Sequence, residues 1–71
     1  MSTLMAFLEE QKKKKITVFT SAGDIYEGEL DDFDIYANIS LANCTVNSEK
    51  ERKFCAINGL IVTHIKMAEI N

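Results

Sequence analysis

Tyr36 and Asn38 are the two side chains whose types and spacing best suit recognition of a flat ligand. A tyrosine ring offers a π face on which a nucleobase could stack, and such stacking contributes about 1–3 kcal/mol per base. The Asn38 amide supplies both a donor and an acceptor, which can pair with the edge of a nucleobase. The structural alternatives are a strand-end tyrosine packed on a sheet and an asparagine that stabilises a turn through local backbone. The residue types alone leave both interpretations open.

Catalytic chemistry has less support in the sequence. The single histidine, His64, has no acid, nucleophile or metal ligand matched to it. Paired carboxylates can do acid–base chemistry, but the clustered acidic residues alternate along strands or sit in turns, as solvent-facing residues do. These residues are Asp24, Glu27, Glu29, Asp31, Asp32 and Asp34. We therefore expect a protein that is not an enzyme and has no catalytic residue, cofactor or metal site.

The length of the chain bears on its stability. Its 71 residues predict a single domain spanning 1–71. A chain this short buries little surface, and small scaffolds usually gain stability from disulfides, a metal or association. Two cysteines are too few for a disulfide framework. Association with further copies is therefore the expected source of extra stability.

Charge and hydropathy restrict the partners and the compartment. The formal net charge of −3 argues against a general nucleic-acid coat, which would be basic, although a local site can still bind a few bases by stacking. No apolar run approaches the length of a membrane span, and the N-terminus lacks the features of a signal peptide. We expect a cytoplasmic protein in which Cys44 and Cys55 are reduced.

Hydrophobic periodicity predicts one helix followed by five short strands. Leu4, Phe7 and Leu8 share one face of the expected helix, whereas Ile16 and Val18 alternate with polar residues, as in a half-buried strand. A glycine inside the second strand marks a bulge or bend. The expected helix covers 2–11, and the expected strands cover 15–21, 25–33, 37–46, 54–57 and 61–67. This pattern predicts a mostly β protein, with a short N-terminal helix before a strongly bent five-stranded antiparallel small barrel.

Two glycine-bearing segments carry a family resemblance. Residues 23–38 have the pattern Gly-x-x-x-x-Gly-x-Leu-x-x-Phe-Asp-x-Tyr-x-Asn, and residues 57–65 have the pattern Ile-Asn-Gly-x-x-Val-x-x-Ile. In order and spacing they resemble the two halves of the signature of the Sm-like (LSm) family, which includes archaeal-type Sm-like proteins and the related Hfq superfamily. The resemblance covers roughly residues 16–66, and the preceding helix also fits it.

The resemblance implies an assembly and a function. In this family the fourth strand of one subunit pairs with the fifth strand of the next, which closes a ring of six or seven subunits. Here residues 54–57 would pair with residues 62–66 of a neighbouring copy, which removes exposed strand edges. The implied function is binding of short single-stranded, uridine-rich RNA, as a chaperone or scaffold, by a homo-oligomeric ring.

The resemblance also implies which residues bind RNA. Tyr36 takes the stacking position, Asn38 takes the position that hydrogen-bonds the base, and Asp34 matches the aspartate that braces their loop. Asn58, before Gly59, stands where the family has an arginine. An asparagine cannot stack as a charged guanidinium plane, so a turn role for Asn58 stays open. The candidate RNA-binding residues are Tyr36, Asn38, Asp34, Asn58 and Gly59.

A second function competes with RNA binding. The missing arginine and the negative net charge favour a ring that acts only as a protein-assembly scaffold and has lost RNA binding. Tyr36, Asn38 and Asp34 favour the RNA-binding interpretation. The lysines at 12–15 would form a circle of positive charge around a ring, although we favour their interpretation as a solvated run at a helix end.

Overall fold

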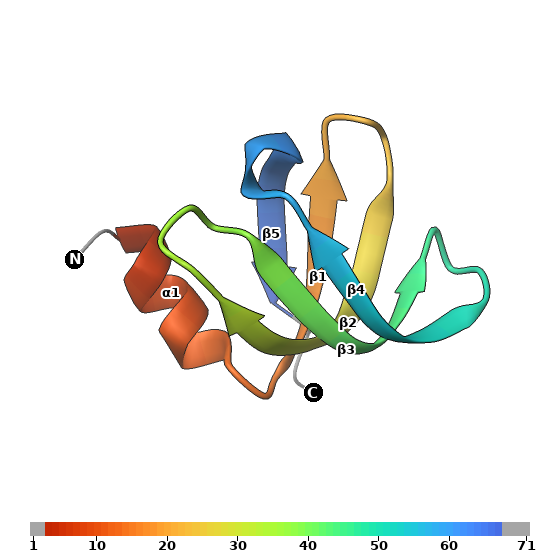
Figure 1. Cartoon of the computed structure of the whole chain (residues 1–71), viewed down its shortest axis with the longest axis horizontal. Coiled ribbons are helices and arrows are strands. Elements are labelled where there is room, and N and C mark those ends of the chain that lie inside the picture. The colour runs from red at the N-terminus through yellow and green to blue at the C-terminus, as the bar shows by residue number, and fades with distance from the viewer. Residues whose placement is uncertain (1–2, 68–71) are drawn as a thin grey trace.

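The chain folds as one helix against a bent antiparallel sheet, and the computed structural model describes residues 3–67 (Figure 1). The elements are α1 (Thr3–Gln11), β1 (Lys15–Thr20), β2 (Ile25–Phe33), β3 (Ile39–Val46), β4 (Glu51–Ile57), the 3-10 turn η1 (Gly59–Ile61) and β5 (Val62–Met67). The five strands form one sheet in the order β4-β3-β2-β1-β5. This confirms the expected fold class.

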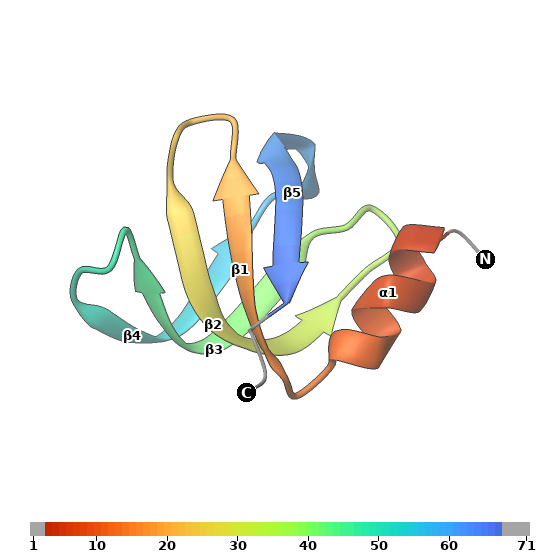
Figure 2. The same cartoon turned by 180° about the vertical axis from the view of Figure 1, so that it is seen from behind.

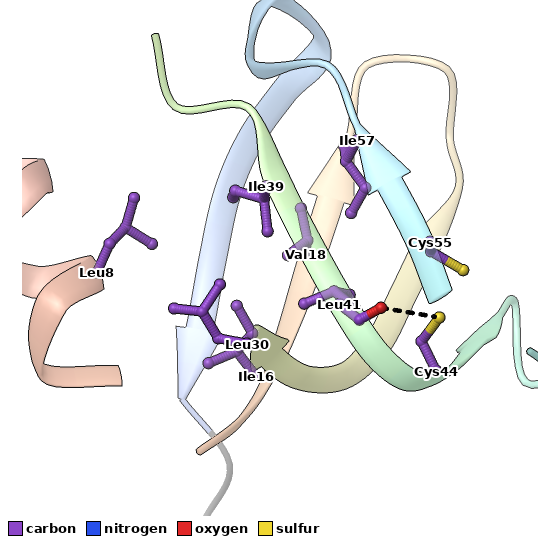
Figure 3. Packing of buried hydrophobic residues seen from close by; sticks show 9 residues of the cluster. All are labelled: Leu8, Ile16, Val18, Leu30, Ile39, Leu41, Cys44, Cys55 and Ile57. Atoms are coloured by element: carbon purple, nitrogen blue, oxygen red, sulfur yellow. Dashed lines mark hydrogen bonds between the residues drawn. The ribbon is translucent and has the colours of Figure 1, made fainter. Parts of the chain in front are cut away.

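The core lies on the concave side of the sheet (Figure 3). Ile16 and Val18 alternate with less buried neighbours along β1, as their spacing predicts. Leu8 of α1 is also fully buried against this cluster, so the helix docks on the barrel through one side chain and its neighbours. The buried cluster comprises Leu8, Ile16, Val18, Leu30, Ile39, Leu41, Cys44, Cys55 and Ile57.

Gly28 permits the bend in the sheet. A Cβ at this position would lie 2.6 Å from the Cβ of Cys44 on β3, so no larger residue fits without movement. The register between β2 and β3 shifts twice, between Glu27 and Glu29 and again between Leu30 and Asp32. β2 continues through the two aspartates that follow Leu30, as the expected range of 25–33 requires, because an irregularity in the ladder accommodates them without ending the strand.

Strand boundaries differ from the sequence predictions at several ends. The third strand begins at Ile39 instead of 37, because a tight turn occupies the residues before it. The fourth strand begins at Glu51 instead of 54, because Thr45 still pairs with Glu51 across the hairpin. Charged residues can pair in a sheet through their backbone groups alone. The charged side chains of residues 51–53 therefore gave no sign that the strand begins there. The first strand ends at Thr20 and the fifth begins at Val62, each one residue inside the expected range, and expected helix residue 2 lies outside the described part.

Both cysteines are free and buried. Cys44 packs beside Cys55, and its thiol lies 3.8 Å from the carbonyl oxygen of Leu41 (Figure 3). Burial and, after it, the neighbouring Cys55 thiol raise the pKa of Cys44 to about 11. A thiol with such a pKa stays protonated and unreactive near neutral pH.

β4 and β5 are the two edges of the sheet, and within residues 3–67 they do not pair with each other. Each edge therefore leaves a row of backbone groups without a partner strand. Across residues 3–67, no helix is long and apolar enough to cross a membrane.

Candidate nucleic-acid interface

Asp34 organises the turn that connects β2 with β3. Its Oδ1 accepts hydrogen bonds from the backbone N–H groups of Tyr36, at 2.9 Å, and Asn38, at 3.0 Å. Its Oδ2 accepts a third bond, at 3.0 Å, from Nδ2 of Asn38. The chain reverses between them, with Ala37 at a φ of 62°. The carboxylate thus fixes the backbone on both sides of Tyr36.

These bonds also set the ionisation of Asp34. The side-chain hydrogen bond from Asn38 is the largest cause that lowers the pKa of the carboxyl group below its ordinary value of 3.8, and the two backbone N–H groups act in the same direction. Donors that favour the charged form account for this direction. Asp34 is therefore a stable acceptor, not a proton donor, near neutral pH.

Asn38 joins this turn to the segment that follows β4. Its Oδ1 accepts a hydrogen bond from the backbone N–H of Gly59 at 2.8 Å. Gly59 lies so close to the turn that a Cβ would fall 2.1 Å from the carbonyl oxygen of Tyr36. Only a glycine allows this approach, so the two halves of the sequence signature meet at one place.

Asn58 serves the local backbone. Its Oδ1 accepts a hydrogen bond from the N–H of Leu60 at 2.9 Å, and its carbonyl oxygen accepts one from Ile61 at 3.1 Å. Asn58 is thus the N-cap of η1. This is the turn role that the sequence left open.

Three large apolar side chains are exposed on these two loops. The exposed fractions are 77% for Ile35, 75% for Tyr36 and 91% for Leu60. We call these three residues the exposed rim. The sequence identified Tyr36 but missed Ile35 and Leu60, because an aliphatic residue beside a strand is normally expected to be buried. The local sequence pattern carries no signal for their exposure, which depends on the fold of the two loops.

The remaining sequence candidates lie elsewhere. Lys12 forms an ion pair with Asp32 at 3.7 Å and lies 5.7 Å from the centre of the Phe33 ring. His64 stacks on Phe19 with ring centres 4.2 Å apart, on the outer face of the sheet. Over the part of the chain that the structure describes, no three His, Cys, Asp or Glu residues are grouped to hold a metal ion.

The clamped loops, the bent sheet and the N-terminal helix are those of an Sm-like domain, and the family comparison agrees. The model of the LSM domain matches residues 6–67. The chain belongs to the LSM domain family.

Solved structures of archaeal proteins show the same fold. A novel Sm-like protein of Pyrobaculum aerophilum has a TM-score of 0.86 and 28% identity, over 92% of this chain and 51% of that one. The present chain therefore spans about half the length of that relative. The Pyrococcus abyssi Sm protein in complex with a uridine heptamer has a TM-score of 0.86 and 22% identity, over 94% of this chain and 100% of that one. The SmAP1 heptamer of P. aerophilum has a TM-score of 0.83 and 23% identity, and the alignment covers 97% of each chain. None of the curated proteins compared with this chain matches it significantly.

Proposed function

We propose that this chain assembles into a homo-oligomeric ring that binds short single-stranded, uridine-rich RNA as a chaperone or scaffold. The observation that carries the proposal is the clamped turn of residues 34–38. Asp34 and Gly59 fix the backbone around Tyr36, and the Tyr36 ring stays 75% exposed. An exposed ring on a fixed backbone loses only the freedom of its own side chain when a base stacks on it. The uridine heptamer bound by the Pyrococcus protein supports the choice of ligand.

The free edges of the sheet support the ring. β4 and β5 lie at opposite ends of the strand order, so the β4 edge of one copy can pair with the β5 edge of the next. Such head-to-tail contacts close into rings when the rotation between copies permits it. Six or seven copies would bring as many Tyr36 side chains around one opening, and a tethered second base then binds at high effective concentration.

Asn38 keeps part of its hydrogen-bonding capacity for a base. Nδ2 donates one hydrogen to Asp34, and Oδ1 accepts one from Gly59. An amide has two donor hydrogens and two acceptor lone pairs, so one of each remains for the carbonyl and N–H groups of a uracil. In this proposal Asn38 both holds the two loops together and reads the base, while Asp34, Asn58 and Gly59 position it.

Fluorescence anisotropy with labelled oligo-U, at two salt concentrations, tests the RNA site. We expect Tyr36→Ala to cost about 1–3 kcal/mol of binding free energy per engaged base while the ring remains intact. Ile25→Ala removes an apolar side chain that is 38% exposed at the start of β2 and should leave binding unchanged. Asn58→Arg should tighten binding and steepen its salt dependence. Absence of oligo-U binding by both the unmodified protein and Asn58→Arg at low salt would reject the RNA site.

Two observations favour a second function. Asn58 is committed to the η1 turn, and the chain carries a net charge of −3, so this rim lacks the cation that would help hold a phosphate backbone. A ring that serves only as a protein-assembly scaffold fits these two facts. Intact rings that bind neither oligo-U nor oligo-A would support it. The non-enzymatic role and the cytoplasmic location stay predictions from the sequence.

A further inference from the structure

Leu60 has the highest exposed fraction, 91%, among the large apolar side chains of residues 3–67. Its backbone is nevertheless fixed on both sides. The N–H of Leu60 donates to Oδ1 of Asn58 at 2.9 Å, and the carbonyl oxygen of the next residue, Ile61, accepts a hydrogen bond from the N–H of Ser21 at 2.8 Å. Ile61 packs against the core cluster, whereas Leu60 does not. The 3-10 turn η1 therefore holds an apolar side chain in solvent at a defined place.

This place adjoins the candidate base site. Leu60 directly follows Gly59, whose N–H donates to Oδ1 of Asn38 at 2.8 Å. Gly59 also touches the turn so closely that a Cβ on it would collide with the carbonyl oxygen of Tyr36. Figure 2 shows η1 at the start of β5 and, toward α1, the turn that leads into β3. Because consecutive Cα atoms are only about 3.8 Å apart, the Leu60 side chain begins within reach of a base held by Tyr36 and Asn38.

The charges around Leu60 favour a neutral group as its ligand. Residues 34–38 and 58–61 contain no lysine or arginine, and their single charge is the carboxylate of Asp34. This carboxylate already accepts hydrogen bonds from Tyr36 and Asn38. A phosphate group finds no cation on these two segments, whereas an aliphatic side chain can cover the flat face of a nucleobase and remove it from water.

We propose that Leu60 covers the second face of the base that stacks on Tyr36. This inference rests on the RNA site proposed above and assigns one further contact in it. A stacked base has two faces, and the Tyr36 ring covers one of them. An aliphatic side chain on the other face adds apolar contact without adding charge. Leu60 thus strengthens the binding of the base and makes no contact with the phosphate backbone, while Asn38 reads the edge of the base.

Fluorescence anisotropy with labelled oligo-U tests the contribution of Leu60. We expect Leu60→Ala to weaken binding about three- to tenfold per engaged base. The factor should be the same at low and at high salt, because an apolar contact releases no counterions. Leu60→Met keeps an apolar side chain of similar volume and should retain most of the affinity. Ile35→Ala, the matched control, removes an exposed aliphatic side chain from the residue before Tyr36 and should weaken binding less.

A double-mutant cycle tests whether Leu60 and Tyr36 contact the same base. Without the Tyr36 ring no base is held in the stacked position. Leu60→Ala should therefore weaken binding by a smaller factor in the Tyr36→Ala background than in the unmodified protein. Two independent factors that simply multiply would overturn the inference, because the two side chains would then contact different parts of the RNA.

Two further outcomes would also overturn the inference. One is oligo-U binding by Leu60→Ala that equals binding by the unmodified protein. The other is loss of the ring in Leu60→Ala while the unmodified protein assembles, measured by native mass spectrometry, since Leu60 would then be an assembly contact. Absence of oligo-U binding by the unmodified protein rejects the RNA site itself, whereas binding that is insensitive to Leu60→Ala rejects only the role of Leu60.

Discussion

The barrel core and the clamped loops are held together by different forces. In the core, Ile16, Leu30 and Leu41 are fully buried. Removal of their apolar surface from water stabilises the folded state. In the loops, Asp34 and Asn38 make directional hydrogen bonds at exposed positions. A buried apolar side chain can be exchanged for another apolar side chain of similar volume at little cost, whereas a hydrogen-bonded clamp depends on specific atoms. Mutations of similar size should therefore have very different effects in the two regions.

The largest contrast in stability is expected when leucine is replaced by alanine once in the core and once in the loops. Leu41→Ala leaves a cavity in the core and should lower the free energy of unfolding by about 2–5 kcal/mol. Leu60→Ala removes the same atoms from a side chain that is 91% exposed. This substitution should change the free energy of unfolding by less than about 0.5 kcal/mol. Urea unfolding followed by circular dichroism measures both. Equal losses would mean that Leu60 is buried in solution, for example inside the assembly.

A smaller loss of stability is expected for a substitution where the two loops touch. Gly59→Ala places a Cβ within 2.1 Å of the carbonyl oxygen of Tyr36, so the loops must separate. We expect a cost of about 1–3 kcal/mol, as for overpacking elsewhere, and faster hydrogen exchange at the amide of residue 59, which loses Asn38 as its acceptor. Exchange at β1 amides should change less. Unaltered exchange at residue 59 would show that the clamp is not the contact that holds these loops.

Acid should loosen the loops before it affects the core. The pKa of Asp34 is lowered in the folded state, so its hydrogen bonds contribute stability above its ordinary value of 3.8. That contribution is lost as the pH falls through the lower folded-state pKa. We expect the amide resonances of Tyr36 and Asn38 to shift together below pH 3.8 in NMR spectra, and Asp34→Asn to abolish this transition. A joint transition above that pH would contradict the assigned direction.

The last prediction involves no substitution and concerns the reactivity of the two thiols, which belong to the core. Because both cysteines are buried, and burial is the largest cause that raises the pKa of Cys44 to about 11, the folded protein should react slowly with a thiol reagent at neutral pH. After unfolding in denaturant, both cysteines should react within the mixing time. Finding no reactive thiol after unfolding, with the mass of an oxidised pair, would contradict the reduced state.

The two regions also differ in what the sequence could predict. The alternation at Ile16 and Val18 and the bend at Gly28 follow from local pattern, so the helix and the five strands were predictable. The clamp between Asn38 and Gly59 joins residues far apart in the sequence, and only the folded sheet brings them together. The family resemblance named both residues, but not the bond between them. The exposure of Leu60 likewise depends on tertiary packing, for which local pattern has no signal.

Native mass spectrometry with and without oligo-U tests the central claim most directly. At micromolar concentration we expect the mass of six or seven copies, and on addition of oligo-U we expect the same ring with bound RNA. Tyr36→Ala should give a ring of unchanged size that retains much less RNA under identical conditions. A monomer as the main species, or a ring that binds oligo-U equally well with and without the Tyr36 side chain, would contradict the account.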